Sequence, residues 1–218
     1  MIKYYPVCLK LEGKKCVVVG GGRVAERKVA SLLSCGALVQ VISPVLTSRL
    51  SQLVKKGRIE HVKDDYKPKF LSGSLIVIAA TDDEKINNRI ASQAGKRGIL
   101  VNVVDSPEEC TFIVPASLKR GDLSISIFTN GLSPALSGKI RQQLEEKYGR
   151  EYGEFLKIMA RLRPKVLREV RDPRKRKQIF RSLVESDILE LIRKGKRKEI
   201  QEKIKNIIKC SSYENRKV

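Results

Sequence analysis

Residues 17–33 read VVVGGGRVAERKVASLL and place three glycines between an apolar run and an amphipathic one. Within this stretch, GGGRVA (20–25) fits the pattern G-x-G-x-x-[GA]. The pattern binds the pyrophosphate of a dinucleotide when it follows a strand and opens a helix, which is the context here. A glycine-rich turn without a ligand is the alternative, and a P-loop is disfavoured because no Gly-Lys-Ser/Thr follows. The stretch therefore favours a dinucleotide-binding α/β fold.

Each small residue of this motif has its own structural role. Gly20 permits the tight turn, Gly22 lets the backbone approach a pyrophosphate, and Ala25 lets the helix pack near the strand. The pyrophosphate would lie on free N–H groups at the helix N-terminus, where the helix dipole adds to the attraction. We expect this dinucleotide to be bound by Gly20, Gly22, Arg23, Val24, Ser43, Pro44 and Thr81.

The residue expected at the adenosine ribose departs from the usual pattern. About 20 residues after the glycine motif, at the end of the second strand, NAD-binding sites often carry an acid. Here that place reads Ile42-Ser43-Pro44. Ser43 could hydrogen-bond a ribose hydroxyl, but it selects only weakly between NAD and NADP.

Apolar runs and helical stretches alternate through the N-terminal half of the chain, as is typical of a parallel sheet with crossover helices. Runs such as LIVIAA (75–80) do not alternate with polar residues, which indicates strands covered on both faces. We therefore predict an α/β fold with a Rossmann-like, doubly wound parallel sheet. Strands are expected at 15–20, 38–43, 58–62, 74–81 and 99–105, and helices at 23–35, 46–56 and 83–96.

The pattern changes after Asp105. TFIVPASL (111–118) and DLSISIFT (122–129), joined by a turn-like KRGD, predict a hairpin. Ser133-Pro134 and Asp172-Pro173 are helix start signals, an N-cap followed by proline, and only helices are expected from about 134 to 208. We predict a Rossmann domain at 1–110, a segment of hairpin and helix at 111–145, and a basic helical domain at 146–218.

The chain carries 45 Lys and Arg against 24 Asp and Glu, and roughly two thirds of this excess lies in residues 113–218. A basic surface favours nucleic acid, acidic membrane or a highly carboxylated small molecule. Aromatic residues make up only 5% and no nucleic-acid motif is evident, so no nucleic-acid partner is expected. No apolar run approaches the roughly 18 residues of a membrane helix. We expect no membrane association and, without an apolar signal segment, a cytoplasmic location.

Two acidic clusters follow predicted strands, where the ligands of a doubly wound sheet bind. Asp82 and Asp83 follow the fourth strand, and capping of the next helix is favoured over chemistry for both. Asp105 ends the fifth strand, and its position leaves a general acid/base role and turn capping equally open. His61, the single histidine, has no partner at metal-ligand spacing, so neither a metal site nor a Ser-His-Asp triad is expected.

Four stretches together resemble the siroheme synthase N-terminal family, the precorrin-2 dehydrogenases that in some members are also sirohydrochlorin ferrochelatases. They are VVVGGGRVAERK (17–28), AATDD (79–83), NVVDSPEECTFIVPA (102–116) and NGLSP (130–134). The resemblance runs in order through about residues 1–145, whereas the helical tail is similar in kind only.

The resemblance implies an NAD-dependent oxidation of precorrin-2 to sirohydrochlorin, with ferrous iron insertion as an optional second activity. It places the catalytic aspartate of the family on Asp105 and a substrate-site serine on Thr129, and we expect Asn130 and Ser133 of the same turn to join the substrate site. It also implies a homodimer formed through the segment 111–145, with the hairpin at 111–130 in the interface. Because precorrin-2 carries many carboxylates, the basic C-terminal half would be a suitable landing surface.

Three other functions fit the residues alone. An NAD-sensing regulator would bind dinucleotide through Gly20 and Gly22 without needing Asp105. A nucleic-acid-binding module would lose affinity steeply with salt. A Rossmann oxidoreductase for another acidic substrate would be separated only by assay.

Overall fold

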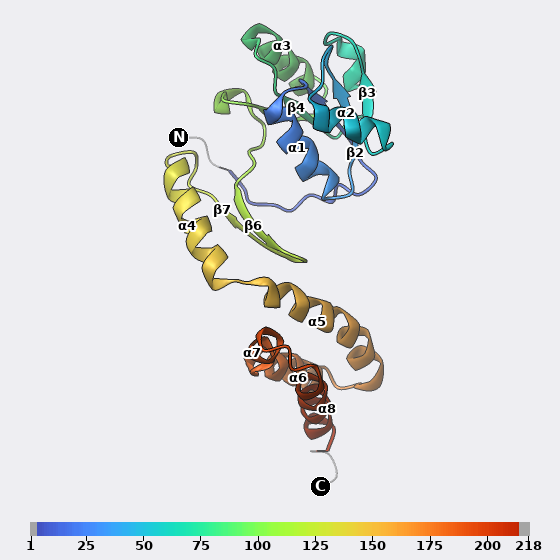
Figure 1. The fold of residues 1–218 in the computed structure, drawn as a ribbon, viewed down its shortest axis with the longest axis vertical. Helices are drawn as coiled ribbons and strands as arrows, with labels where there is room; N and C mark the ends of the chain where they lie inside the picture. The colour runs from blue at the N-terminus through green and yellow to red at the C-terminus, as the bar shows by residue number, and fades with distance from the viewer. Residues whose placement is uncertain (1–3, 214–218) are drawn as a thin grey trace. The chain divides into compact units, whose positions relative to one another are not determined.

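The computed structural model describes residues 4–213, and the side chains through residue 209. The chain divides into two compact units, Met1–Val114 and Pro115–Val218, which are described separately (Figure 1). The first unit contains every strand of the parallel sheet, and the second contains a hairpin followed only by helices.

The first unit is a five-stranded parallel sheet with the strand order β3-β2-β1-β4-β5. This order confirms the Rossmann-like prediction, because the chain starts in the middle of the sheet and winds outward in both directions. The strands are β1 (Lys15–Val19), β2 (Leu38–Ile42), β3 (Glu60–Val62), β4 (Ile76–Ala79) and β5 (Leu100–Val103). The helices are α1 (Arg23–Leu33), α2 (Ser48–Lys55) and α3 (Glu84–Gly95), with short 3-10 turns at Pro68–Leu71 and Pro107–Glu109.

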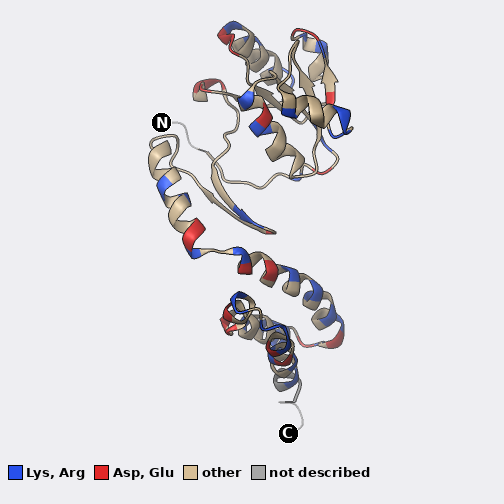
Figure 2. Cartoon of the chain, viewed as in Figure 1, with Lys and Arg blue, Asp and Glu red and all other residues tan. Residues whose placement is uncertain are grey.

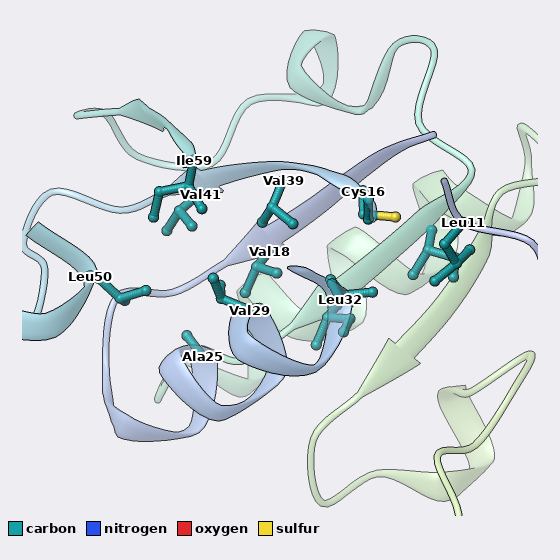
Figure 3. Packing of buried hydrophobic residues seen from close by; sticks show 13 residues of the cluster. Leu11, Cys16, Val18, Ala25, Val29, Leu32, Val39, Val41, Leu50 and Ile59 are labelled. Atoms are coloured by element: carbon teal, nitrogen blue, oxygen red, sulfur yellow. The ribbon is translucent and has the colours of Figure 1, made fainter. Parts of the chain in front are cut away.

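Apolar clusters cover both faces of this sheet. On one face Val18 of β1 packs with Val29 of α1 and Leu50 of α2 (Figure 3). On the other face Val17 lies in a second cluster with Ile90 of α3. Successive residues of a strand point to opposite faces, so the uninterrupted VVV run supplies both clusters. The strand ends are thereby fixed against helices on two sides.

The second unit begins with an antiparallel hairpin of β6 (Ala116–Arg120) and β7 (Leu123–Ile127). Its turn is Gly121-Asp122, with Gly121 at φ +60°, as a two-residue hairpin turn requires. The helices are α4 (Pro134–Lys147), α5 (Arg150–Glu169), α6 (Pro173–Glu185), α7 (Ile188–Arg193) and α8 (Arg197–Tyr213). Both predicted start signals are confirmed, since Ser133 caps α4 and Asp172 caps α6.

The first hairpin strand is shorter and lies later than predicted. We expected a strand at 111–118, but β6 starts at Ala116. The residues before β6 belong to the first unit instead, because the N–H groups of Thr111 and Phe112 both donate to the carbonyl of Val101 in β5. Pro115, which has no N–H to donate, lies between this segment and β6.

Candidate functional site

The carboxyl ends of all five parallel strands open into one cleft of about 670 Å³ within the first unit. This is the edge at which doubly wound sheets bind their ligands. All seven residues expected to bind the cofactor line it, and so does Asp105. The lining residues are Val19–Val24, Ile42–Thr47, Asp64–Tyr66, Ala80–Asp82, Ile86, Val104 and Asp105.

The three glycines have distinct surroundings at the start of this cleft. A β-carbon on Gly20, which has φ +120°, would lie 2.1 Å from the carbonyl oxygen of Ala80, and one on Gly21 would lie 1.9 Å from that of Val45. A β-carbon on Gly22 would meet nothing within 4 Å. Gly20 and Gly21 therefore let neighbouring loops approach, whereas Gly22 keeps one side of the loop open. The need for Gly21 was missed by sequence reasoning.

The start of α1 fits a bound phosphate. Its N-cap is Gly22, and no side chain caps the free N–H groups of the first turn. Those groups and the helix dipole attract an anion. The open side of Gly22 leaves the approach unobstructed, so the residues fit the pyrophosphate of a nicotinamide dinucleotide.

The end of β2 presents Ser43, which is 9% exposed, to the cleft. Its hydroxyl donates to the carbonyl of Val45 at 2.7 Å. Its own carbonyl lies 2.9 Å from Nε2 of His61, so the histidine supports this loop. The Ser43 oxygen can still accept a hydrogen bond, but its hydrogen is already donated.

The two adjacent aspartates after β4, Asp82 and Asp83, have different contacts. Asp83 caps α3, because its carboxylate accepts from the N–H of Ile86 at 3.1 Å. Asp82 does not cap the helix and lines the cleft instead, so capping is confirmed for one residue of the pair only. Thr81 also faces the cleft, and its hydroxyl donates to Asn87 Oδ1 at 2.8 Å.

Asp105 has an unusual backbone conformation at the end of β5. Its φ is +62°, in the left-handed region that few residues other than glycine adopt. Asp tolerates this region better than most residues, yet such conformations collect at functional sites. The turn points an exposed carboxyl group into the cleft that the glycine loop enters.

A half-buried lysine next to this turn was also missed by sequence reasoning. Lys28 Nζ donates to Oδ1 of Asn102, a β5 side chain that is only 7% exposed, at 3.3 Å. Burial, and then the charge of Arg27, lower the pKa of Lys28. The negative charge of Asp105 acts in the opposite direction.

The three residues expected at the substrate belong to the second unit. Thr129 and Ser133 share one turn, in which the N–H of Ser133 donates to Thr129 Oγ1 at 3.3 Å. Asn130 forms the bend of that turn with φ +51°. The Thr129 hydroxyl also lies 3.1 Å from that of Ser137 on α4. These contacts place the three residues together at the N-terminus of α4.

Lys and Arg residues recur along the helices of the second unit (Figure 2). Within the part of the chain that the structure describes, no three His, Cys, Asp or Glu side chains gather as they would around a metal ion. No helix among these described residues has the length and apolar character needed to cross a membrane.

The fold and the cleft define the class of this chain as an NAD(P)-binding Rossmann protein. The family model described as "Putative NAD(P)-binding" matches residues 7–116, "Sirohaem biosynthesis protein central" matches 120–147 and "Sirohaem synthase dimerisation region" matches 151–208. The chain belongs to the siroheme synthase N-terminal family. The dimerisation region thus lies after the segment 111–145 in which we expected the dimer contact, and that expectation stays a prediction.

Known proteins of this family align along nearly the entire chain. The siroheme synthase of Photorhabdus laumondii is 34% identical over 97% of this chain and 45% of its own length. That of Chromobacterium violaceum is 35% identical over 89% of this chain and 41% of its own. This chain spans less than half the length of these curated relatives. The solved structure of SirC, a precorrin-2 dehydrogenase, matches with a TM-score of 0.78 and 25% identity, over 93% of this chain and 100% of its own.

Proposed function

We propose that this chain is an NAD-dependent precorrin-2 dehydrogenase that produces sirohydrochlorin. One observation carries the proposal. Asp105, held at positive φ, lines the same cleft as the glycine loop, and the helix α1 that this loop opens has no side-chain cap. The similarity to SirC supports the choice of substrate, because it extends over all of that protein. The siroheme synthases named above support the same pathway.

The ends of β1, β2 and β4 hold the dinucleotide in this proposal. Gly22 and the first turn of α1 receive the pyrophosphate, since no side chain caps that turn. Ser43 and Pro44 face the adenosine ribose, and Thr81 lies on the opposite side of the glycine loop. When bound, NAD supplies the hydride acceptor of the oxidation.

Asp105 accepts the proton in this mechanism. Oxidation of precorrin-2 removes a hydride and a proton, so the electron pair of the broken C–H bond leaves with the hydride. The proton requires a base within hydrogen-bonding reach of the reacting atoms. The Asp105 carboxylate lies at the end of β5, on the half of the sheet opposite to β2, where the nicotinamide half of a dinucleotide binds.

Replacement of Asp105 tests this assignment. Asp105→Ala should keep the fold and the affinity for NADH but lose most turnover of precorrin-2. Asp105→Asn is the sharper variant, because Asn also tolerates positive φ and therefore removes the charge without disturbing the turn. Full activity of either variant would refute the role of Asp105, even if the protein is a dehydrogenase.

The tetrapyrrole and a second copy of the chain complete the proposal. Thr129, Asn130 and Ser133 are assigned to the substrate because they form a partly exposed turn at the N-terminus of α4, where the helix dipole favours a carboxylate. The match to a dimerisation region supports a homodimer. Sedimentation should then give twice the chain mass of 24.6 kDa, and a single-chain mass would contradict it.

A further inference from the structure

We propose that Asp64 and Asp65, at the end of β3, make this site select NAD and reject NADP. The inference rests on the proposed function only in requiring that the cleft bind a nicotinamide dinucleotide. NADP differs from NAD by one phosphate on the 2′ oxygen of the adenosine ribose. The residues that discriminate between the two must therefore act at the adenosine end.

Strand order tells which end of the cleft holds the adenosine. In a doubly wound sheet the adenosine half lies on the side of β2, because the ribose is recognised from the end of that strand. Here β3 is the neighbour of β2, with Val41 of β2 opposite His61 of β3. The loop after β3 contributes Asp64, Asp65 and Tyr66 to the lining of the cleft. These two carboxylates therefore lie at the adenosine end, and Asp105 lies at the other.

Hydrogen-bonding groups at this end suit a ribose diol. Ser43 has already donated its hydroxyl hydrogen to Val45, and Thr47 donates its own to Glu26 at 2.9 Å. Carboxylates only accept, so the side chains of Ser43, Asp64 and Asp65 all offer oxygen acceptors. The 2′ and 3′ hydroxyls of a ribose can donate to them. A 2′-phosphate is an acceptor itself and would find no partner in these groups.

The charge of the cleft lining also favours NAD over NADP. The cleft lining contains four carboxylates, Asp64, Asp65, Asp82 and Asp105, and a single cation, Arg23. This is the reverse of the whole chain, which has a net charge of +21 and would by itself attract the more anionic cofactor. Like charges brought together suppress the wrong ligand, and a 2′-phosphate adds almost two negative charges beside two carboxylates.

The two aspartates should contribute unequally. Lys67 forms an ion pair with Asp64 and offsets part of its charge. The Asp65 carboxylate is exposed and has no hydrogen-bond or ion-pair partner among residues 4–213. Asp65 should therefore be the stronger determinant. Arg23 is the first residue of α1, beside Gly22, and is assigned to the pyrophosphate that both cofactors share.

The test compares dissociation constants of NADH and NADPH, measured by calorimetry on the full chain. The wild type should bind NADH at least about tenfold more tightly than NADPH. Asp65→Asn should reduce this ratio, and the double change Asp64→Asn with Asp65→Asn should reduce it by about tenfold or more. Asp82→Asn is the matched control, because it removes one charge from the same cleft at the end of β4 and should leave the ratio unchanged within about twofold.

Smaller probes locate the effect. ADP-ribose and its 2′-phosphorylated form lack nicotinamide, and they should show the same discrimination and the same loss of it in the double variant. Arg23→Gln should weaken both dinucleotides equally. A wild type that binds NADPH as well as NADH would overturn the inference. So would a ratio that is unchanged in the double variant, or one that moves as far in Asp82→Asn.

This experiment is independent of the proposed reaction. Binding ratios need no precorrin-2, so a protein that discriminates as described but oxidises no precorrin-2 would lose the proposed function and keep this inference. A protein that oxidises precorrin-2 equally well with NAD and NADP would keep the proposed reaction and lose this inference.

Discussion

Three successive glycines share one sequence pattern, but each has a different neighbour. A β-carbon at Gly21 would collide with the Val45 carbonyl at 1.9 Å, whereas at Gly22 it would point into open space. Gly21→Ala should therefore destabilise the first unit by about 1–3 kcal/mol, as overpacking does. Gly22→Ala should leave stability nearly unchanged and weaken NADH binding about tenfold or more, because the added methyl group obstructs the pyrophosphate.

Thermal unfolding and NADH titration of the two glycine variants separate these effects. If Gly22→Ala binds NADH like the wild type, the pyrophosphate does not lie against this loop. If Gly21→Ala is as stable as the wild type, the loop after β2 is free to move away.

Residue-level prediction was accurate for local structure. The glycine motif located the tight turn at Gly20, the open side of Gly22 and the start of α1. Cofactor binding by these residues stays a prediction. Gly21 was missed because its neighbour, Val45, comes from the loop after another strand. Lys28 was missed for the same reason, since its partner Asn102 is 74 residues away. Contacts of this kind depend on strand order, which local pattern does not specify.

Helix capping at the end of β4 gives a prediction at the scale of the element. Asp83 accepts from the N–H of Ile86, and loss of such a cap costs about 0.5–2 kcal/mol. Asp83→Ala should lower the free energy of unfolding by that amount, measured by urea denaturation. Asp82→Ala is the control, since Asp82 caps nothing, and an equal loss in both variants would contradict the assignment.

A buried carboxylate joins α5 to α7. Glu151 is 9% exposed and accepts from Nε and Nη2 of Arg193 at 2.8 and 2.6 Å. Burial raises its pKa, but the hydrogen bonds from Arg193 and the backbone outweigh burial, so the pKa falls below its ordinary value of 4.5. The stabilisation is therefore complete above that value and is lost as the pH falls through the lower, folded-state pKa.

Glu151→Gln tests this linkage. The variant should be less stable than the wild type at neutral pH, and the difference between their melting temperatures should shrink as the medium is acidified below 4.5. Scanning calorimetry at several pH values measures it. A difference that is constant across the acid range would show that packing, and not charge, accounts for the loss.

Element prediction was accurate for strands buried on both faces and poor at the junction of the two units. The uninterrupted apolar runs identified β1 and β4 to within a few residues. The segment 111–115 also contains an apolar run, Phe112 to Val114, but the N–H groups of Thr111 and Phe112 donate to the carbonyl of Val101 in β5. Apolar character indicates burial, and it does not tell which sheet a segment joins.

For the whole molecule, the distribution of charge predicts that salt affects the binding of precorrin-2 and of NADH differently. The second unit contains most of the positive charge, whereas the charged residues that line the cleft of the first unit are mainly carboxylates. Raising NaCl from about 0.05 to 0.5 M should increase the KM for precorrin-2 severalfold, because salt screens the attraction of its carboxylates. The dissociation constant of NADH should change less, and the reverse order would contradict this use of charge.

The most direct test of the account is the rate of NADH formation from NAD and freshly generated precorrin-2. The wild type is compared with Asp105→Asn, after titration has shown that both bind NADH with the same affinity. We predict NADH and sirohydrochlorin in equal amounts for the wild type, and a rate at least about a hundredfold lower for the variant, as expected when a general base is lost. No NADH from the wild type, with dinucleotide binding intact, would contradict the central claim that this cleft oxidises precorrin-2.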